Sequence, residues 1–397
     1  MITLDVAKEC SSPNAMLDRA LKVATFYGFV PFEEAPTGER AVVSGRTLKI
    51  DPNTRFVRRE EKRLIDAIRT CAARGLGDRR MPAFLLKLAP GEKGTGHTIL
   101  ELHVLGIHTA AAEALLITVA DAIAHELGIE DRLVHINSIG AGESSDRYLR
   151  ELSGFLRKQA EYLSSEQRER TQTDPVGTLL SLRAPKTSLL LMRAPSSLDY
   201  LSEDERRHFW NVLEYLEFAG KVYELNPAVI GSNDCWAHTI FEISYPQKTA
   251  DGIVRIPFAL GGRYDTLLSH TLGPGSSGVH VAITFGPKPI AVPLIRKSRW
   301  KPEVYLAHLG IEAKRRSIPI LEKLRQAEIP VYHSLAFDQL GPQMAAVKRL
   351  GAPWLILMGH KEALANEVVV RNIRTNAQDT ISSLELIDYL RRRHVGM

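Results

Sequence analysis

The chain has only three cysteines, and none of them lies near another. Cys10, Cys71 and Cys235 form no C-x-x-C pair. That spacing argues against a zinc knuckle and against a disulfide framework. Three separate thiols fit a reducing compartment, so we expect a cytoplasmic protein.

Long apolar runs are also missing. No stretch approaches the roughly 18 uncharged apolar residues that a membrane helix needs, and the first ten residues lack a basic segment followed by an apolar one. We therefore expect neither export nor membrane insertion. The excess of positive over negative charge is also small, because a net charge of +5 and a pI near 9.0 are modest for 397 residues. The charge permits a polyanionic partner without identifying one.

What is present indicates a multidomain globular protein. A length of 397 residues predicts two or three domains, and 44% hydrophobic with 24% charged residues is ordinary for folded chains. The segment 287–302 is rich in proline and positive charge, which is typical of a linker. We place a core domain at residues 1–300 and a second domain at 301–397.

Apolar periodicity in the core predicts alternating helices and strands. Helical periodicity covers 14–27 and 110–127, and most of 144–223, which we interpret as a helical insertion. Strand-like runs cover 83–88, 99–105, 134–138, 238–245, 253–260 and 279–285. The first two strands flank a glycine-rich loop at 91–96 that does not match a P-loop. The expected fold is α+β, with an antiparallel sheet flanked by helices.

The second domain shows shorter runs in alternation. Strand-like and helix-like runs follow one another at 304–309, 311–327, 329–334, 339–350, 354–358, 367–373 and 384–393. This order predicts a small α/β unit around a mixed sheet.

One group of residues has side chains of the kinds that bind metal ions. Glu101, His103 and His108 lie close together in the sequence. An i, i+5 spacing does not place both histidines on one face of a strand, so we expect no metal site there.

The stretch Gly261-Gly262-Arg263-Tyr264-Asp265 resembles a signature of class II histidyl-tRNA synthetases. Further similar stretches lie at 27–36, 127–129, 136–140, 199–201 and 208–209, and the region from Glu303 onward is similar to the family's anticodon-binding domain. The resemblance implies a class II synthetase-like core, a C-terminal anticodon-binding-like domain and a homodimer.

The arginines that the family uses to bind ATP are missing from the matching positions. Pro90, Gly231 and Pro287 stand where the resemblance expects arginines, whereas Glu92 and Asp234 are retained. Condensing ATP with histidine concentrates negative charge that arginine and Mg²⁺ must stabilise. Losing one transition-state donor typically costs about 2.7–4 kcal/mol, so we expect the ligase reaction to be lost.

The resemblance also places an amino-acid pocket. It assigns a carboxylate to Glu60, and it puts Val104 and His108 where the family has polar residues and Trp236 where it has a tyrosine. Gly261, Gly262, Arg263 and Tyr264 complete the pocket candidates. The glycine pair serves either close approach of a ligand or a sheet bulge. Arg263 and Asp265 either orient the pocket or lock a turn as an ion pair.

Three clusters of basic residues are candidates for contact with RNA. They are Lys314-Arg315-Arg316, Arg391-Arg392-Arg393 and the group Arg55, Arg58, Arg59, Lys62 and Arg63. Cationic side chains supply most non-specific affinity for nucleic acids, whereas solvated helix faces carry similar clusters. The first two lie on the anticodon-domain scaffold, which favours RNA contact there.

Three functions follow from these observations. The first is a paralogue of histidyl-tRNA synthetase that does not aminoacylate and acts as an RNA-binding or regulatory homodimer, without a cofactor. The second is a divergent active histidine–tRNA ligase, which alone requires ATP and Mg²⁺. The third is the family's relative that regulates ATP phosphoribosyltransferase through a protein partner.

Overall fold

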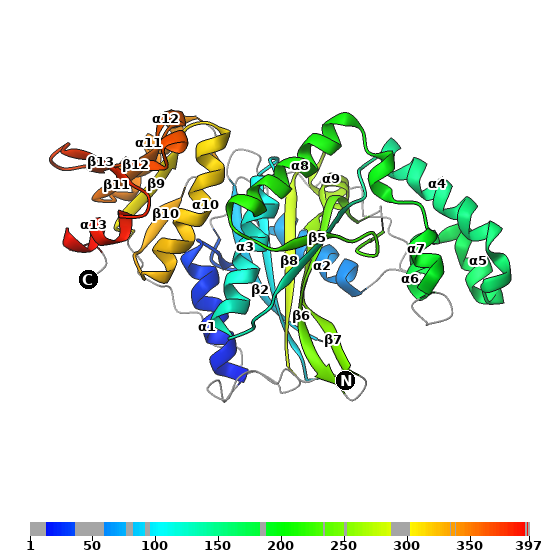
Figure 1. Ribbon diagram of the computed structural model, residues 1–397. Helices are drawn as coiled ribbons and strands as arrows, with labels where there is room; N and C mark the ends of the chain where they lie inside the picture. The colour runs from blue at the N-terminus through cyan, green and yellow to red at the C-terminus, as the bar shows by residue number, and fades with distance from the viewer. Residues whose placement is uncertain are drawn as a thin grey trace.

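The computed structural model contains two β-sheets with helices packed around them (Figure 1). It describes residues 13–35, 59–76, 82–91, 96–182, 188–232, 235–249, 252–286, 302–333, 335–337, 339–393 and 395. Among these residues, no helix has the length and apolar character needed to cross a membrane.

The larger sheet forms the centre of the core domain. Its strands are β1 (Val30–Pro31), β2 (Ala83–Pro90), β3 (Thr98–Leu105), β4 (Leu133–Ser138), β5 (Tyr223–Leu225), β6 (Ala237–Thr249), β7 (Gly252–Arg263) and β8 (Gly278–Phe285). They lie in the order β1-β2-β3-β8-β7-β6-β4-β5. The neighbours from β2 to β4 pair antiparallel, as predicted, and only the outermost strands β1 and β5 pair parallel.

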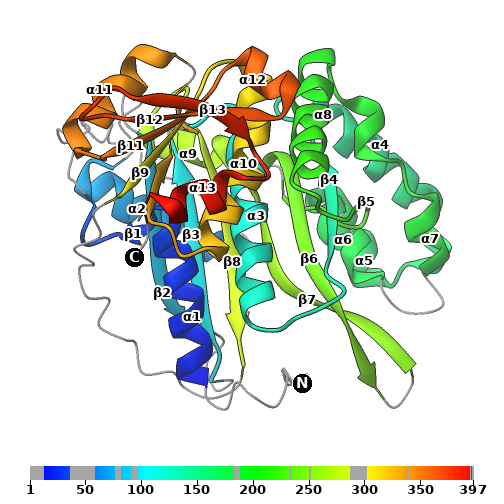
Figure 2. The same ribbon diagram turned by 60° about the vertical axis from the view of Figure 1, so that its left-hand side comes forward.

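One face of this sheet is covered by α1 (Pro13–Phe26), α3 (Ala111–Glu126) and α8 (Glu203–Phe218), as Figure 2 shows. Nearly every residue of α3 is buried. Small alanine side chains alternate with leucine, isoleucine and valine along α3, so it packs closely on the sheet below and on the helices beside it. This helix-covered face contains the main apolar core.

The opposite face is covered by α2 (Arg59–Arg74) and α9 (Asp265–Leu272). Leu64 and Ile68 of α2 pack with Leu267 of α9 and Leu85 of β2 in a second apolar cluster. α2 was not predicted, although Leu64, Ile65, Ile68 and Cys71 recur at helical spacing and form one buried face.

A helical lobe extends from the sheet on the side away from the C-terminal domain (Figure 1). It consists of α4 (Glu143–Lys158), η1 (Ala160–Tyr162), α5 (Ser165–Thr173), α6 (Pro175–Ser181), α7 (Ser188–Arg193) and η2 (Ser197–Tyr200). Ser164 and Asp174 cap α5 and α6 through their side-chain oxygens. The lobe is shorter than the predicted insertion at 144–223, since α8 at its end packs into the main apolar core.

The C-terminal domain has its own sheet. Its elements are β9 (Val304–His308), α10 (Ile311–Gln326), β10 (Val331–His333), α11 (Leu340–Leu350), β11 (Trp354–Met358), α12 (His360–Ala365), β12 (Glu367–Asn372), β13 (Gln378–Ser382) and α13 (Leu386–Arg392). The strand order is β10-β9-β11-β12-β13. β10, β9 and β11 run parallel and β11, β12 and β13 antiparallel, which confirms the predicted mixed sheet.

Polar contacts join the two domains along α10. The buried hydroxyl of Tyr27 donates a 2.5 Å hydrogen bond to Glu322, and Arg325 donates to Glu126 at 2.7 Å. His333 contacts the carbonyl oxygen of Tyr27 at 3.0 Å. The C-terminal domain therefore packs directly on α1 and α3.

Replacing Tyr27 by phenylalanine tests this contact. Tyr27→Phe removes a hydrogen bond to a charged group, which is worth about 1.5–3 kcal/mol, so we expect a lower free energy of unfolding in urea titrations. Tyr162→Phe is the matched control, because Tyr162 is exposed and such changes stay within about 0.5 kcal/mol. Equal stability of the two variants would contradict the prediction.

Candidate functional site

The motif 261–265 ends β7 in the middle of the larger sheet. Gly262 pairs with His280 of β8, and His280 pairs in turn with His103 of β3. Residues two apart on a strand point to the same face, so Glu101 joins the two histidines. The result is a cluster of three polar side chains on the face covered by α2 and α9.

The glycine pair is required by the neighbouring strands. A Cβ atom on Gly261 would lie 2.3 Å from the carbonyl oxygen of His280, and one on Gly262 would lie 2.7 Å from that of Thr239. Real Cβ contacts of this length essentially never occur. The strand pairing of β7 also shifts register near its end, between Ala237 and Ile240 of β6. The two glycines thus permit close approach of backbone to backbone.

Aromatic and charged side chains surround the cluster. Arg63 of α2 places its Nε 2.9 Å from Oε1 of Glu101. Nδ1 of His103 and the hydroxyl of Tyr264 lie 3.0 Å apart. The rings of His103 and His280 are 4.6 Å apart between centroids, with Phe32 against the first and Trp236 beside the second.

Burial controls the charges of this cluster. Burial, with a smaller contribution from Lys87, lowers the pKa of His103 to about 3. Burial also lowers the pKa of His280 well below its usual value. Burial raises the pKa of Glu101, and the charges of Arg63 and Lys87 oppose that change only in part. At neutral pH both imidazoles are uncharged, so they offer nitrogen lone pairs and no positive charge.

Arg263 points to the other face of the sheet. Its guanidinium donates to both carboxylate oxygens of Glu113 in α3, at 2.7 and 2.5 Å. It also donates to the hydroxyl of Ser277 at 2.5 Å and to the carbonyl oxygens of Ile107 and Thr109. Asp265 lies 3.3 Å away. Of the two predicted roles, the structure shows the ion pair: Arg263 pairs with Glu113 and Asp265 and points away from the cluster, because the side chain of each successive strand residue points to the opposite face.

The charges of this ion pair stabilise one another. Burial, the largest influence, favours the neutral forms, but Glu113 raises the pKa of Arg263 overall. Arg263 and His208 likewise lower the pKa of Glu113 against the effect of burial. Both residues are at most 1% exposed, so the pair is a charged link inside the protein.

The chain is similar to histidine–tRNA ligases in its sequence. Over 295 residues it is 30% identical to the "Histidine--tRNA ligase" of Synechococcus sp. (strain JA-3-3Ab), covering 73% of this chain and 69% of that protein. The chain belongs to the histidine–tRNA ligase family. It is also 29% identical over 298 residues to the enzyme of Halothermothrix orenii, covering 74% of this chain and 70% of that protein.

The C-terminal domain has a family match of its own. Residues 303–393 match the family described as "Anticodon binding domain". Among solved structures, the apo histidyl-tRNA synthetase of S. aureus is similar over 98% of this chain and 99% of that one, with 21% identity and a TM-score of 0.49. The predicted fold is confirmed: a class II histidyl-tRNA synthetase-like core with helices around its sheet, and a C-terminal anticodon-binding domain.

The positions where the family resemblance expects arginine differ in what surrounds them. Pro90 lies exposed at the end of β2, opposite Thr98. Gly231 is covered by Trp236, whose Cδ1 would lie 2.4 Å from a Cβ atom at that position. Pro287 lies outside the described residues, as do Glu92 and Asp234, and Glu60 belongs to α2 without a described side chain.

Two further pocket candidates lie away from the cluster. The side chain of Val104 is fully buried in the main core on the helix-covered face, away from the cluster. His108 is exposed and lines a small hollow with Leu105, Gly106, Leu268, Leu272 and Ser277. Tyr264 and Trp236 are the candidates that the structure brings to the cluster.

The sequence indicated only part of this cluster. Glu101 and His103 were noted, but their partner is His280 and not His108. His280 lies 177 positions further along the chain, and only the pairing of β3 with β8 brings it near. Arg63 was predicted only as a member of a basic group considered for RNA, whereas the structure pairs it with Glu101. Phe32 was not singled out, and it packs against His103.

The basic cluster of α10 is occupied by contacts within the protein. Lys314 is 3% exposed, which removes it as an RNA contact. Arg315 forms an ion pair with Glu214 and donates to Asn211 of α8, and Arg316 lies over the ring of Phe218. By contrast, Arg391, Arg392 and Arg393 of the C-terminal helix region are exposed, although Arg393 pairs with Asp379 at 3.4 Å.

The buried ion pair can be tested by separating its members. Arg263→Met leaves the Glu113 carboxylate buried without its main partner, which costs about 3–5 kcal/mol. We expect Arg263→Met with Glu113→Leu to lose less than the sum of the single changes, measured as free energies of unfolding in urea.

The control for this prediction is an exposed ion pair. Arg207 and Glu203 lie 3.2 Å apart on α8 with side chains 66% and 91% exposed, and such pairs contribute at most about 1 kcal/mol. A loss for Arg263→Met no greater than that for Arg207→Met would show that the pair has no special role.

Proposed function

We propose that this chain is a histidyl-tRNA synthetase-like protein that does not aminoacylate tRNA. The observation that carries the proposal is the contact between Trp236 and Gly231. Gly231 occupies the position where the family resemblance expects a catalytic arginine, and the indole fills the space directly above it. An arginine side chain at this position would require Trp236 to move.

The charge of the neighbouring cluster supports the same proposal. Activation of an amino acid by ATP needs fixed cations near the reacting phosphate. On this face His103 and His280 are neutral, and Arg63 is already engaged with Glu101 at 2.9 Å. These residues offer no free cation to the phosphates of ATP, which favours a protein that has kept the fold and lost the reaction.

Histidine-dependent ATP–pyrophosphate exchange tests the proposal. We expect the purified chain, with Mg²⁺ and histidine, to exchange no more label than a blank without enzyme, because the phosphate would lack its arginine partners. The ligase of Synechococcus sp., run in parallel, is the positive control. Exchange that depends on histidine would contradict the proposal and establish the alternative of a divergent active ligase.

A second candidate function is RNA binding through the C-terminal domain. The match of residues 303–393 to an anticodon-binding family favours it. The exposed side chains of Arg391 and Arg392 on α13 provide cations that can reach phosphates. This candidate is compatible with a lost ligase reaction, because binding of RNA does not require the missing arginines.

Filter binding of tRNA at several salt concentrations tests this candidate. Each phosphate contact contributes slightly less than one unit to the slope of log affinity against log salt. Arg391→Ala with Arg392→Ala should therefore weaken binding and lower that slope by about 2. The matched control is Lys348→Ala with Arg349→Ala, which removes two exposed cations from α11 of the same domain. Equal losses in both double variants would reject α13 as the RNA-binding surface.

Regulation of a protein partner remains the third candidate. Solved structures similar to this chain include one named as an "ATP phosphoribosyltransferase regulatory subunit/histidyl-tRNA synthetase" of Bacillus halodurans, with 14% identity, 90% and 96% of the two chains covered and a TM-score of 0.41. That likeness carries no argument about function. The homodimer and the cytoplasmic location likewise stay predictions of the sequence.

A further inference from the structure

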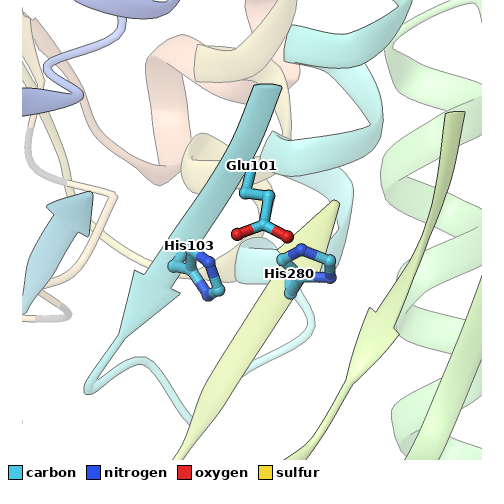
Figure 3. A group of neighbouring side chains, drawn as sticks. All are labelled: Glu101, His103 and His280. Atoms are coloured by element: carbon cyan, nitrogen blue, oxygen red, sulfur yellow. The ribbon is translucent and has the colours of Figure 1, made fainter. Parts of the chain in front are cut away.

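The three side chains of the cluster point toward one another from two adjacent strands (Figure 3). Glu101 and His103 come from β3 and His280 from β8. Each is at most 1% exposed. One oxygen or nitrogen atom of each lies within 4.8 Å of those of the other two.

Several of these polar atoms have no partner in the part of the chain that the structure describes. They are Nε2 of His103 and both ring nitrogens of His280, and no hydrogen bond reaches either oxygen of Glu101. Oε1 of Glu101 faces Arg63, so Oε2 is left free. Buried polar groups are almost always satisfied by protein, water or an ion, and unsatisfied atoms on three neighbouring buried side chains indicate a missing ligand.

We propose that Glu101, His103 and His280 bind one divalent transition-metal ion, of which zinc fits best. Two imidazole nitrogens and one carboxylate oxygen are a donor set that zinc prefers when a fourth position stays open. Zinc bonds to these atoms are about 2.0–2.2 Å long, so the ligand atoms must approach one another more closely than 4.8 Å. Rotation of the three side chains on their fixed strands supplies that movement.

The surroundings orient two of the ligands. The hydroxyl of Tyr264 lies 3.0 Å from Nδ1 of His103, which leaves Nε2 as the ring nitrogen available to an ion. Partners of this kind on the second nitrogen are a regular feature of metal-binding histidines. On the other side, Phe32 and Trp236 enclose the rings and keep their nitrogens away from bulk water.

The positive charge of Arg63 would repel a bound metal ion. This charge lies next to Glu101, and the side chain of Arg63 is 22% exposed whereas that of Glu101 is 1% exposed. A bound ion would displace the guanidinium toward solvent. Removing that charge should therefore strengthen zinc binding, an effect that a purely structural cluster would not show.

Titration of the full chain with zinc chloride after treatment with a chelator tests the site. We expect one zinc ion per chain by calorimetry, and a cobalt-substituted form with the visible absorption of a four-coordinate ion. His103→Ala, His280→Ala and Glu101→Gln should each weaken zinc affinity more than about 100-fold, and Tyr264→Phe about 10–100-fold. Arg63→Met should strengthen it severalfold.

His270→Ala is the matched control, because His270 is exposed on α9 and remote from the cluster. Melting curves recorded without metal test whether each variant is folded. If an alanine variant does not fold, Glu101→Gln still tests the site, because it preserves the shape of the cluster. Absence of zinc binding, or binding that the three ligand changes leave unaltered, would overturn the proposal. Either result is independent of ATP–pyrophosphate exchange, since zinc alone is the probe.

Discussion

The buried pair of Arg263 and Glu113 ties together parts of the core that are far apart in the sequence. Arg263 ends β7, Glu113 lies in the first turn of α3, and the same guanidinium holds Ser277 ahead of β8 and two carbonyl oxygens ahead of α3. A charged pair at this depth is stable only while its hydrogen bonds are complete. The direction of α3, and with it the helix-covered face, depends on that network. Arg263, within the motif 261–265, thus stabilises the fold through its buried ion pair.

The alternation of side chains along β3, β7 and β8 divides the sheet into two different environments. On the helix-covered face, apolar residues such as Val104 and Val281 pack under α3. On the other face, the same strands present Glu101, His103 and His280. Substitutions on one face of a strand leave the side chains of the other face in place only if the pairing register of the strand is kept. The helix-covered face can therefore keep its apolar packing while the side chains of the polar face change independently.

The sequence predicted the fold well and the site only in part. The helix at 110–127 and the strands at 83–88 and 99–105 were predicted because the pattern of their apolar residues is strong and local. α2 was not predicted because its charged residues outnumber the apolar residues of its buried face. His280 was not predicted to join the cluster because cross-strand neighbours are set by sheet topology. The two roles left open for Arg263 could not be separated, because a motif does not state which face of the sheet a side chain occupies. The resemblance placed Gly231 where the family is expected to have an arginine, but only the structure shows the indole of Trp236 that covers this position.

The arginines of α10 are engaged with α8, and this has a thermodynamic consequence. Arg315 holds Glu214 and Asn211, while Arg316 lies over Phe218. A polyanion that takes these cations must first release them from the core domain. Its binding is then linked to separation of the two domains, and the linkage works equally in both directions. Any ligand that tightens the contact between α8 and α10 makes this surface less available to a polyanion, and a polyanion bound there loosens the contact by the same free energy.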